Sequence, residues 1–122
     1  MKSDHTAKRR KLSSIRYGIT CKDQACGFEY YVTVNFFDDN TPAELFIRIA
    51  KEGSVIAGFV EALAITISIA LQYGVPWIVL HGKYLNQIFE PRDDANSSLI
   101  HALGNTVDKV IKLQNGQKPT NI

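Results

Sequence analysis

The 122-residue sequence lacks the motifs that mark most enzymes. It has no glycine-rich phosphate loop, no His-Glu-x-x-His pair, and no serine, histidine and acidic residue in the order used by hydrolases. Adjacent carboxylates occur in segments with turn chemistry, where they more often promote turns than bind metal. We therefore predict no catalytic residue in this chain.

Cysteine is also scarce, with Cys21 and Cys26 forming the only pair, in the string CKDQAC. Four intervening residues suit a hairpin disulfide or half of a zinc site, and a complete site would need ligands from His5, His81 or His101. Free buried thiols are the expectation for a chain without an export signal, and the disulfide and zinc alternatives stay open. We expect no resident metal or cofactor.

An N-terminal apolar run is missing from residues 1–14, so we expect no signal peptide and a cytoplasmic location. The formal charge is only +2, yet the first 22 residues hold seven of the fourteen basic residues and one acidic residue. The KRRK cluster at residues 8–11 can bind phosphates, or can keep a tail soluble. Only Tyr17 lies near it, so a stacking platform for nucleic acid is not supported there.

Length and composition predict one domain over residues 15–113, preceded by a basic disordered arm over residues 1–14. Residues 114–122 are predicted to be a polar tail. Residues 28–37 and 43–50 alternate apolar and polar side chains and predict two strands of a hairpin, with Asn40 at a left-handed position of the turn. Because two strands are marginal alone, we expect a third strand over about residues 16–20, or from a partner chain.

A long apolar helix is predicted over residues 55–73, with Ser54 capping its start. Its apolar content raises the question of a membrane span, but Glu61 in its middle argues against lipid. A helix that is apolar nearly all round is the buried centre of a domain or the interface of an oligomer. We therefore expect no membrane contact and a homo-oligomer.

Two further helices follow in the sequence. Gly74 and Pro76 end the long helix, and a short helix is predicted over residues 76–85. A final amphipathic helix is predicted over residues 97–113, with Asn96 or Ser97 as its cap. The order of elements predicts an α+β domain in which a small antiparallel sheet is packed by a long central helix, a short helix and a C-terminal helix.

The best site candidate is the turn before the long helix. A helix N-terminus with small residues presents free N–H donors to an anion, and Gly53 and Ser54 supply it here, while Arg48 and Lys51 add positive charge. We predict nucleotide or phosphate binding at these four residues. The alternative is that Gly53 serves only the turn and Ser54 only the cap.

A second candidate lies in the predicted loop over residues 89–96. There Phe89 can stack on a base and Arg92 can hold a phosphate. The alternative makes Phe89 an aromatic plug of the core and Arg92 a surface charge facing Asp93 or Asp94.

Residues 50–91 read AKEGSVIAGFVEALAITISIALQYGVPWIVLHGKYLNQIFEP, with a KEGS turn opening a long helix that runs into LQYGVP. This stretch, with KRRKL at residues 8–12, YVTV at 31–34 and AELFI at 43–47, resembles the TSCPD-type C-terminal domain of adenosylcobalamin-dependent (class II) ribonucleotide reductases. The resemblance covers roughly residues 8–113.

The resemblance implies a soluble appendage rather than a catalytic unit. In these reductases the thiyl-forming cysteine, the substrate pocket and the cobalamin contacts belong to a separate barrel, so adenosylcobalamin would act only through a reductase partner. This sequence ends in QKPTNI, whereas the reductases often end in a mobile cysteine pair, and it lacks the Thr-Ser-Cys-Pro-Asp string that names the domain.

Three functions follow as hypotheses. The first is a non-catalytic TSCPD-like domain that docks on a reductase catalytic chain and binds a nucleotide. The second is an oligomeric protein of phage or mobile-element origin that sequesters a nucleotide. The third is an adaptor stabilised by zinc at Cys21 and Cys26.

Overall fold

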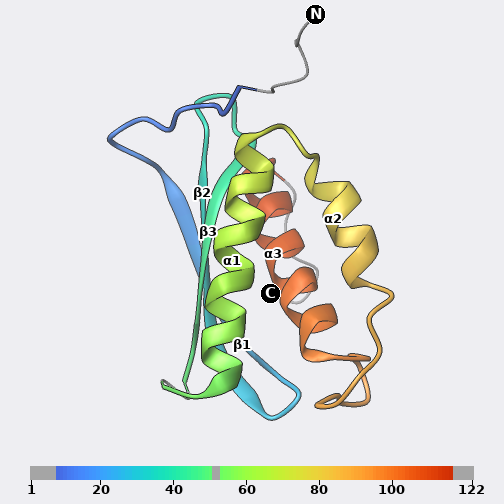
Figure 1. The fold of residues 1–122 in the computed structure, drawn as a ribbon. Helices are drawn as coiled ribbons and strands as arrows, with labels where there is room; N and C mark the ends of the chain where they lie inside the picture. The colour runs from blue at the N-terminus through green and yellow to red at the C-terminus, as the bar shows by residue number, and fades with distance from the viewer. Residues whose placement is uncertain (1–7, 51–52, 117–122) are drawn as a thin grey trace, which may run out of the picture.

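Three antiparallel strands and three helices form the fold in a computed structural model that describes residues 8–50 and 53–116. The elements are, in chain order, β1 (Gly18–Ala25), β2 (Phe28–Phe36), β3 (Pro42–Ile49), α1 (Val55–Gln72), α2 (Trp77–Tyr84) and α3 (Leu99–Gln114). The helices lie on one face and along one edge of the sheet (Figure 1). The predicted α+β class is confirmed.

The sheet has the strand order β1-β2-β3 and is antiparallel throughout. The predicted third strand comes from this chain, but it covers Gly18–Ala25 rather than residues 16–20. It extends further because a tight turn joins it directly to β2, with Cys26 and Gly27 at φ of 55° and 83°. Two successive left-handed residues match the twist of a hairpin, so pairing continues up to the turn. Asn40 is also left-handed, as expected, at φ 67°.

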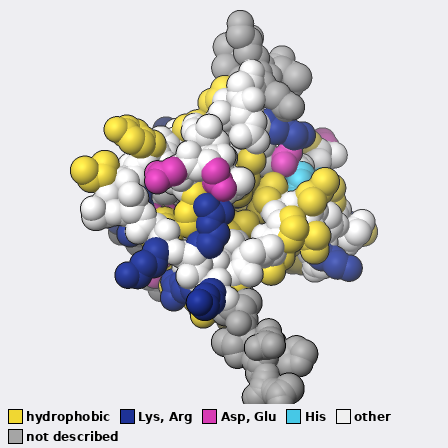
Figure 2. All heavy atoms as spheres, turned by 90° about the horizontal axis from the view of Figure 1, so that it is seen from above, with side chains coloured by type: hydrophobic (Ala, Val, Ile, Leu, Met, Phe, Trp, Pro, Cys, Tyr) yellow, Lys and Arg dark blue, Asp and Glu magenta, His cyan; other side chains and the backbone are white. Residues whose placement is uncertain are grey.

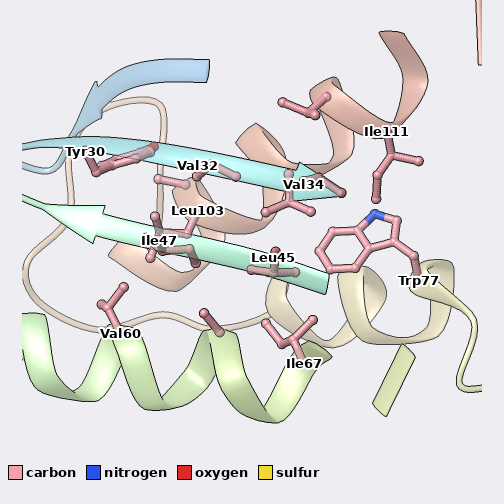
Figure 3. Packing of buried hydrophobic residues seen from close by; sticks show 14 of the residues in the cluster. Tyr30, Val32, Val34, Leu45, Ile47, Val60, Ile67, Trp77, Leu103 and Ile111 are labelled. Carbon is pink, nitrogen blue, oxygen red and sulfur yellow. The ribbon is translucent and has the colours of Figure 1, made fainter. Parts of the chain in front are cut away.

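The core fills the space between the inner face of the sheet and the helices. Alternate residues of β2 and β3, among them Val32, Val34 and Leu45, are buried against Leu103 of α3. Figure 3 shows these side chains between α1 and α3, with the Trp77 ring near Ile111. This alternation sends every second strand residue to the opposite side, the outer face of the sheet.

Helix α1 lies along the open edge of β3. The Ser68 hydroxyl accepts a hydrogen bond from the Leu45 N–H at 2.9 Å, and Gln72 Nε2 donates to the Ala43 carbonyl at 3.0 Å. These side chains form hydrogen bonds with backbone groups of β3 that a neighbouring strand would otherwise use. They thereby protect this edge of the sheet from pairing with another strand. The figure agrees, since α1 runs beside β3 (Figure 1).

Of the two alternatives for the apolar helix, burial of α1 on all sides is wrong, and an oligomer interface stays a prediction. Only a third of its 18 residues are buried, and the exposed ones include several large apolar side chains. A helix at a sheet edge contacts the domain on one side only, so its opposite side remains in solvent. We define the exposed stripe of α1 as Val55, Phe59, Ile65 and Ile69, together with Tyr73 at the C-cap of the helix.

Helix α1 is also long and apolar enough to cross a membrane, with a mean hydropathy of 2.0 over its 18 residues. This finding rests on length and composition alone, and core helices of soluble proteins share it. The hydrogen bonds from Ser68 and Gln72 to β3 tie α1 to the sheet. Absence of membrane contact stays a prediction.

The helix ends follow the sequence signals except at α3. The Ser54 side chain caps α1, as expected, and Gly74 follows its end with φ of 96°. Helix α3 is capped by Ser98, not by Asn96 or Ser97. The Ser97 hydroxyl donates instead to the Gln87 carbonyl, and the Ser98 hydroxyl accepts a hydrogen bond from the His101 N–H in the first turn of the helix.

The basic segment at residues 8–14 contacts the domain, whereas we expected residues 1–14 to be disordered; residues 1–7 lie outside the described residues. The Arg10 N–H donates to the Gln72 carbonyl at 2.8 Å, and the Arg10 guanidinium stacks over Phe37 and pairs with Asp39. These contacts offset the entropy of ordering the segment. Figure 2 shows the Lys and Arg side chains that gather at this end of the molecule.

Candidate functional site

The turn before α1 forms a shallow depression of about 410 Å³. The structure brings together three of the four predicted phosphate-binding residues there, Arg48, Gly53 and Ser54; Lys51 lies outside the described residues. Gly53 is left-handed at φ 78°, and the Ser54 hydroxyl accepts a hydrogen bond from the Ala57 N–H at 3.1 Å. The turn and cap roles are confirmed, and anion binding stays a prediction.

A larger groove of about 810 Å³ lies between the outer face of the sheet and α1. Tyr31, Phe46 and Arg48 line it from the strands, and Glu61 and Ile65 line it from α1. The sequence analysis predicted the two strands that carry these residues but did not select Tyr31 or Phe46 as site residues. The signal was present, because both are aromatic residues at outward positions of neighbouring strands.

The strand register sets the order of side chains on the outer face. Lys22 on β1 pairs with Tyr31 on β2, which in turn pairs with Arg48 on β3. Phe46 occupies the next outward position of β3, opposite Thr33. Tyr31 and Phe46 are 45% and 56% exposed, so both rings present a face to solvent. A partly exposed ring between two cations is a surface suited to an aromatic, negatively charged ligand.

Paired charges occupy the other end of the groove. Glu44 is buried and accepts hydrogen bonds from Arg16 Nη1 at 2.8 Å and from Asn35 Nδ2 at 2.9 Å. Arg9 Nε donates to Gln72 Oε1 at 2.6 Å. Arg16 compensates the charge of Glu44, whereas the contact of Arg9 is with a neutral amide, so Arg9 adds positive charge at this end.

The second sequence candidate, Phe89 and Arg92, lies on the loop between α2 and α3. The Phe89 N–H donates to the Ser97 carbonyl, and the Arg92 guanidinium pairs with Glu90 at 2.8 Å. Phe89 is partly exposed, so the core-plug alternative is wrong, and Arg92 pairs with Glu90 rather than with the aspartates that follow it. Neither residue lines the groove or the depression beside α1.

Cys21 and Cys26 are free thiols as expected, but only Cys26 is buried, and the disulfide alternative is not realised. Burial, together with the negative charge of Asp93, raises the pKa of the Cys26 thiol, which makes it a weak nucleophile at neutral pH. His81 contacts Asn105 and His101 contacts Ser97. Within residues 8–50 and 53–116 no group of three or more metal-ligating side chains is found, and His5 lies outside that part.

A buried polar cluster joins the sheet to α3. Tyr30 is buried and its hydroxyl lies 3.0 Å from Thr106 Oγ1, which donates to Asp23 Oδ2 at 2.9 Å. Lys109 Nζ lies 3.4 Å from the same carboxylate oxygen. Burial raises the pKa of Tyr30 to about 12, so it keeps its proton and donates to Thr106. With these partners the cluster stabilises the fold rather than forming a reactive site.

Asp23 in this cluster makes the free energy of unfolding depend on pH in the acidic range. Burial acts to raise its pKa, but hydrogen bonds from the Gln24 N–H and Thr106 and the charge of Lys109 outweigh burial and lower the pKa below 3.8. A carboxyl with a lowered folded pKa adds stability above its unfolded pKa and loses it as pH falls through the folded pKa.

We expect Asp23→Asn to reduce the free energy of unfolding by about 1 kcal/mol at pH 7. The difference from the wild type should shrink as the pH falls well below 3.8, because both proteins then carry a neutral side chain. Urea denaturation at several pH values measures this, with the exposed loop variant Asp94→Asn as the control. A stability difference between Asp23→Asn and the wild type that stays constant with pH would show that the Asp23 charge does not stabilise the fold.

The TSCPD domain family matches this chain over residues 5–112. The chain is also similar to curated proteins named "Vitamin B12-dependent ribonucleotide reductase". It is 35% identical to that of Rhodopirellula baltica over 105 residues, which is 86% of this chain and 10% of the relative. It is 34% identical to that of Streptomyces clavuligerus over 104 residues, which is 85% of this chain and 11% of the relative.

A third relative, from Streptantibioticus cattleyicolor, is 34% identical over 104 residues, which is 85% of this chain and 17% of the relative. The chain thus spans between a tenth and a fifth of the length of these reductases. No solved structure matches it. Because the family match extends over most of the sequence and the reductase relatives agree with it, the chain belongs to the TSCPD domain family.

Proposed function

We propose that this chain is a non-catalytic accessory domain that docks on the catalytic chain of a vitamin B12-dependent ribonucleotide reductase in the cytoplasm. The relatives support this role, since in each of them the matching region is a small part of a long chain. The observation that carries the proposal is the exposed stripe of α1, which offers an apolar surface to a partner.

The stripe has the properties of a docking surface. Its five side chains are four residues apart except for the step of six from Phe59 to Ile65, so they spread over about 120° of the helix circumference, a broad band along one side. All five are large and apolar and each is exposed, with Phe59 at 73%. Contiguous apolar patches of this kind on a soluble domain mark sites of protein association.

In this proposal adenosylcobalamin is bound by the reductase catalytic chain, and this domain contributes a docking surface only.

The docking role is tested with the purified chain and the B12-dependent reductase of the same organism, by calorimetry. We expect Phe59→Asp to weaken binding at least tenfold, because it places a charge in an apolar interface. Ile78→Asp is the matched control, since Ile78 is an exposed isoleucine of α2, outside the stripe. Absence of binding by the wild type, or equal binding by Phe59→Asp, would refute the role.

Nucleotide binding is the second candidate function, as part of docking or as sequestration by an oligomer. The depression that brings together Arg48, Gly53 and Ser54 at the start of α1 favours it. N–H groups in the first turn of a helix and an adjacent guanidinium are the groups that hold phosphates. Native mass spectrometry of the purified chain with a panel of nucleotides tests both binding and oligomeric state. A monomer that retains no nucleotide would refute this candidate.

A further inference from the structure

The outer face of the sheet carries an aromatic ring between two cations. Tyr31 lies at the centre of a row in which Lys22 and Arg48 are its cross-strand partners. Lys22 Nζ is 5.9 Å from the centroid of the Tyr31 ring. Rings on a sheet surface with adjacent cations stack on nucleobases and attract their phosphates.

A second ring and a helix wall complete the binding surface. Phe46 lies on β3 at the next outward position, diagonal to Tyr31, at a separation that aromatic side chains can bridge. Ile65 and Ile69 of α1 line the same groove and close it on one side. The outer face of the sheet therefore forms a groove with a helical wall. The groove has a volume of about 810 Å³, which is the size of a small-molecule binding site.

The groove adjoins the depression at the start of α1. Arg48 and Glu61 line both the groove and the depression. A ligand bound in the groove can therefore extend to the predicted phosphate-binding residues at the start of α1. Glu61 lies on α1 at this junction, where its carboxylate can accept hydrogen bonds from sugar hydroxyls, as acidic residues do in dinucleotide sites. Aromatic, acidic and basic side chains thus lie on one continuous surface, with Arg48 next to Tyr31 on the sheet and Glu61 facing them from α1.

We propose that this groove binds a ribonucleotide, with its base on Tyr31 and Phe46, its sugar beside Glu61 and its phosphate at Arg48. The inference rests on the proposed nucleotide-binding function and adds the base platform and the sugar contact to it. It is tested separately from the docking role of α1, although Ile65 and Ile69 belong both to the exposed stripe and to the groove.

A single nucleotide fits the charges better than a nucleic acid strand. Glu29 lies 3.8 Å from Lys22 and reduces the positive charge at the β1 side of the row. Glu61 lines the groove itself, whereas Arg16 compensates the charge of Glu44 at the other end. Strand-binding grooves instead follow the phosphate backbone with continuous positive charge, which these carboxylates interrupt.

The test measures affinities of ATP, dATP, pyrophosphate and a short oligonucleotide for the full chain by calorimetry. Loss of a stacking ring should weaken ATP binding about tenfold or more in Tyr31→Ala and in Phe46→Ala, and should leave pyrophosphate binding unchanged. Tyr17→Ala is the matched control, since Tyr17 is an exposed tyrosine that does not line the groove. Thermal unfolding verifies that each variant is folded.

The sugar contact has its own readout. The wild type should prefer ATP to dATP, and Glu61→Gln should reduce this preference, because a neutral amide is a weaker acceptor than a carboxylate. An unchanged preference in Glu61→Gln, or no preference in the wild type, would overturn the position of the sugar.

The outcomes separate this inference from the function on which it rests. If ATP binds equally well to Tyr31→Ala and Phe46→Ala but more weakly to Arg48→Ala, nucleotide binding stands and the base platform is overturned. If no nucleotide or pyrophosphate binds, both are overturned. Tight binding of the oligonucleotide without binding of ATP would show that the ligand is a nucleic acid strand, and this result would also overturn the inference.

Discussion

Replacing Trp77 by alanine is expected to lower the free energy of unfolding by about 3–5 kcal/mol, the largest loss that we expect from a single substitution. Trp77 is only 8% exposed and is the one buried residue of α2. Its ring stacks on His81 at 5.4 Å, and its Nε1–H donates to Asp108 at 3.0 Å. Figure 3 shows the ring near Ile111, where alanine would leave a cavity.

Two further variants separate packing from hydrogen bonding at this position. Trp77→Phe keeps an aromatic ring but removes the donor to Asp108, so its loss should lie between those of the alanine variant and the wild type. Ile78→Ala, at a neighbouring residue that is 78% exposed, should change stability by less than about 0.5 kcal/mol. Urea denaturation followed by circular dichroism measures all three. A loss below about 1 kcal/mol in Trp77→Ala would show that α2 is not anchored by this ring.

The second large effect is expected at Gln72, where leucine should cost about 1–3 kcal/mol. Gln72 is buried, and its amide donates to the Ala43 carbonyl and accepts from Arg9 Nε. Leucine has a similar size but no polar group, so the Ala43 carbonyl at the edge of β3 would lose its donor. The N-terminal segment would also lose one of its contacts with α1.

Chemical denaturation measures the loss, and hydrogen exchange locates it. We expect faster exchange at the β3 edge, including the Leu45 N–H that Ser68 accepts, because α1 would hold the edge less firmly. Gln87→Leu is the control, since Gln87 is exposed. Unchanged stability together with unchanged exchange would mean that apolar packing alone keeps α1 on the sheet.

The pattern of apolar and polar residues predicted the helices and strands well, because each of these elements depends on residues that are close in the sequence. Alternation identified β2 and β3 to within one residue at each end, and the caps at Ser54 and Gly74 delimited α1. The α3 cap was misassigned because Ser97 and Ser98 are equivalent in sequence. A contact of Ser97 with Gln87, at the other end of the loop between α2 and α3, accompanies the choice of Ser98 as the cap.

The candidate site was predicted only in part, for a related reason. Arg48, Gly53 and Ser54 lie within seven positions of one another, so their proximity follows from a short turn. Tyr31 and Phe46 lie on separate strands, and they share a groove only because the register places them on one face beside α1. Phe89 and Arg92 were grouped with the site by chemistry, and the fold places them on another loop.

The sequence by itself determined the α+β class, the family and the helix and strand segments, because periodicity and turn chemistry act between residues close in the chain. Only the tertiary structure decided that α1 protects the edge of β3 and leaves one apolar side exposed. Hydropathy cannot distinguish a helix buried all round from one buried on a single side, since the two have the same composition. The difference arises from which backbone groups the polar side chains Ser68 and Gln72 satisfy, and those groups belong to a strand that lies far away in the sequence.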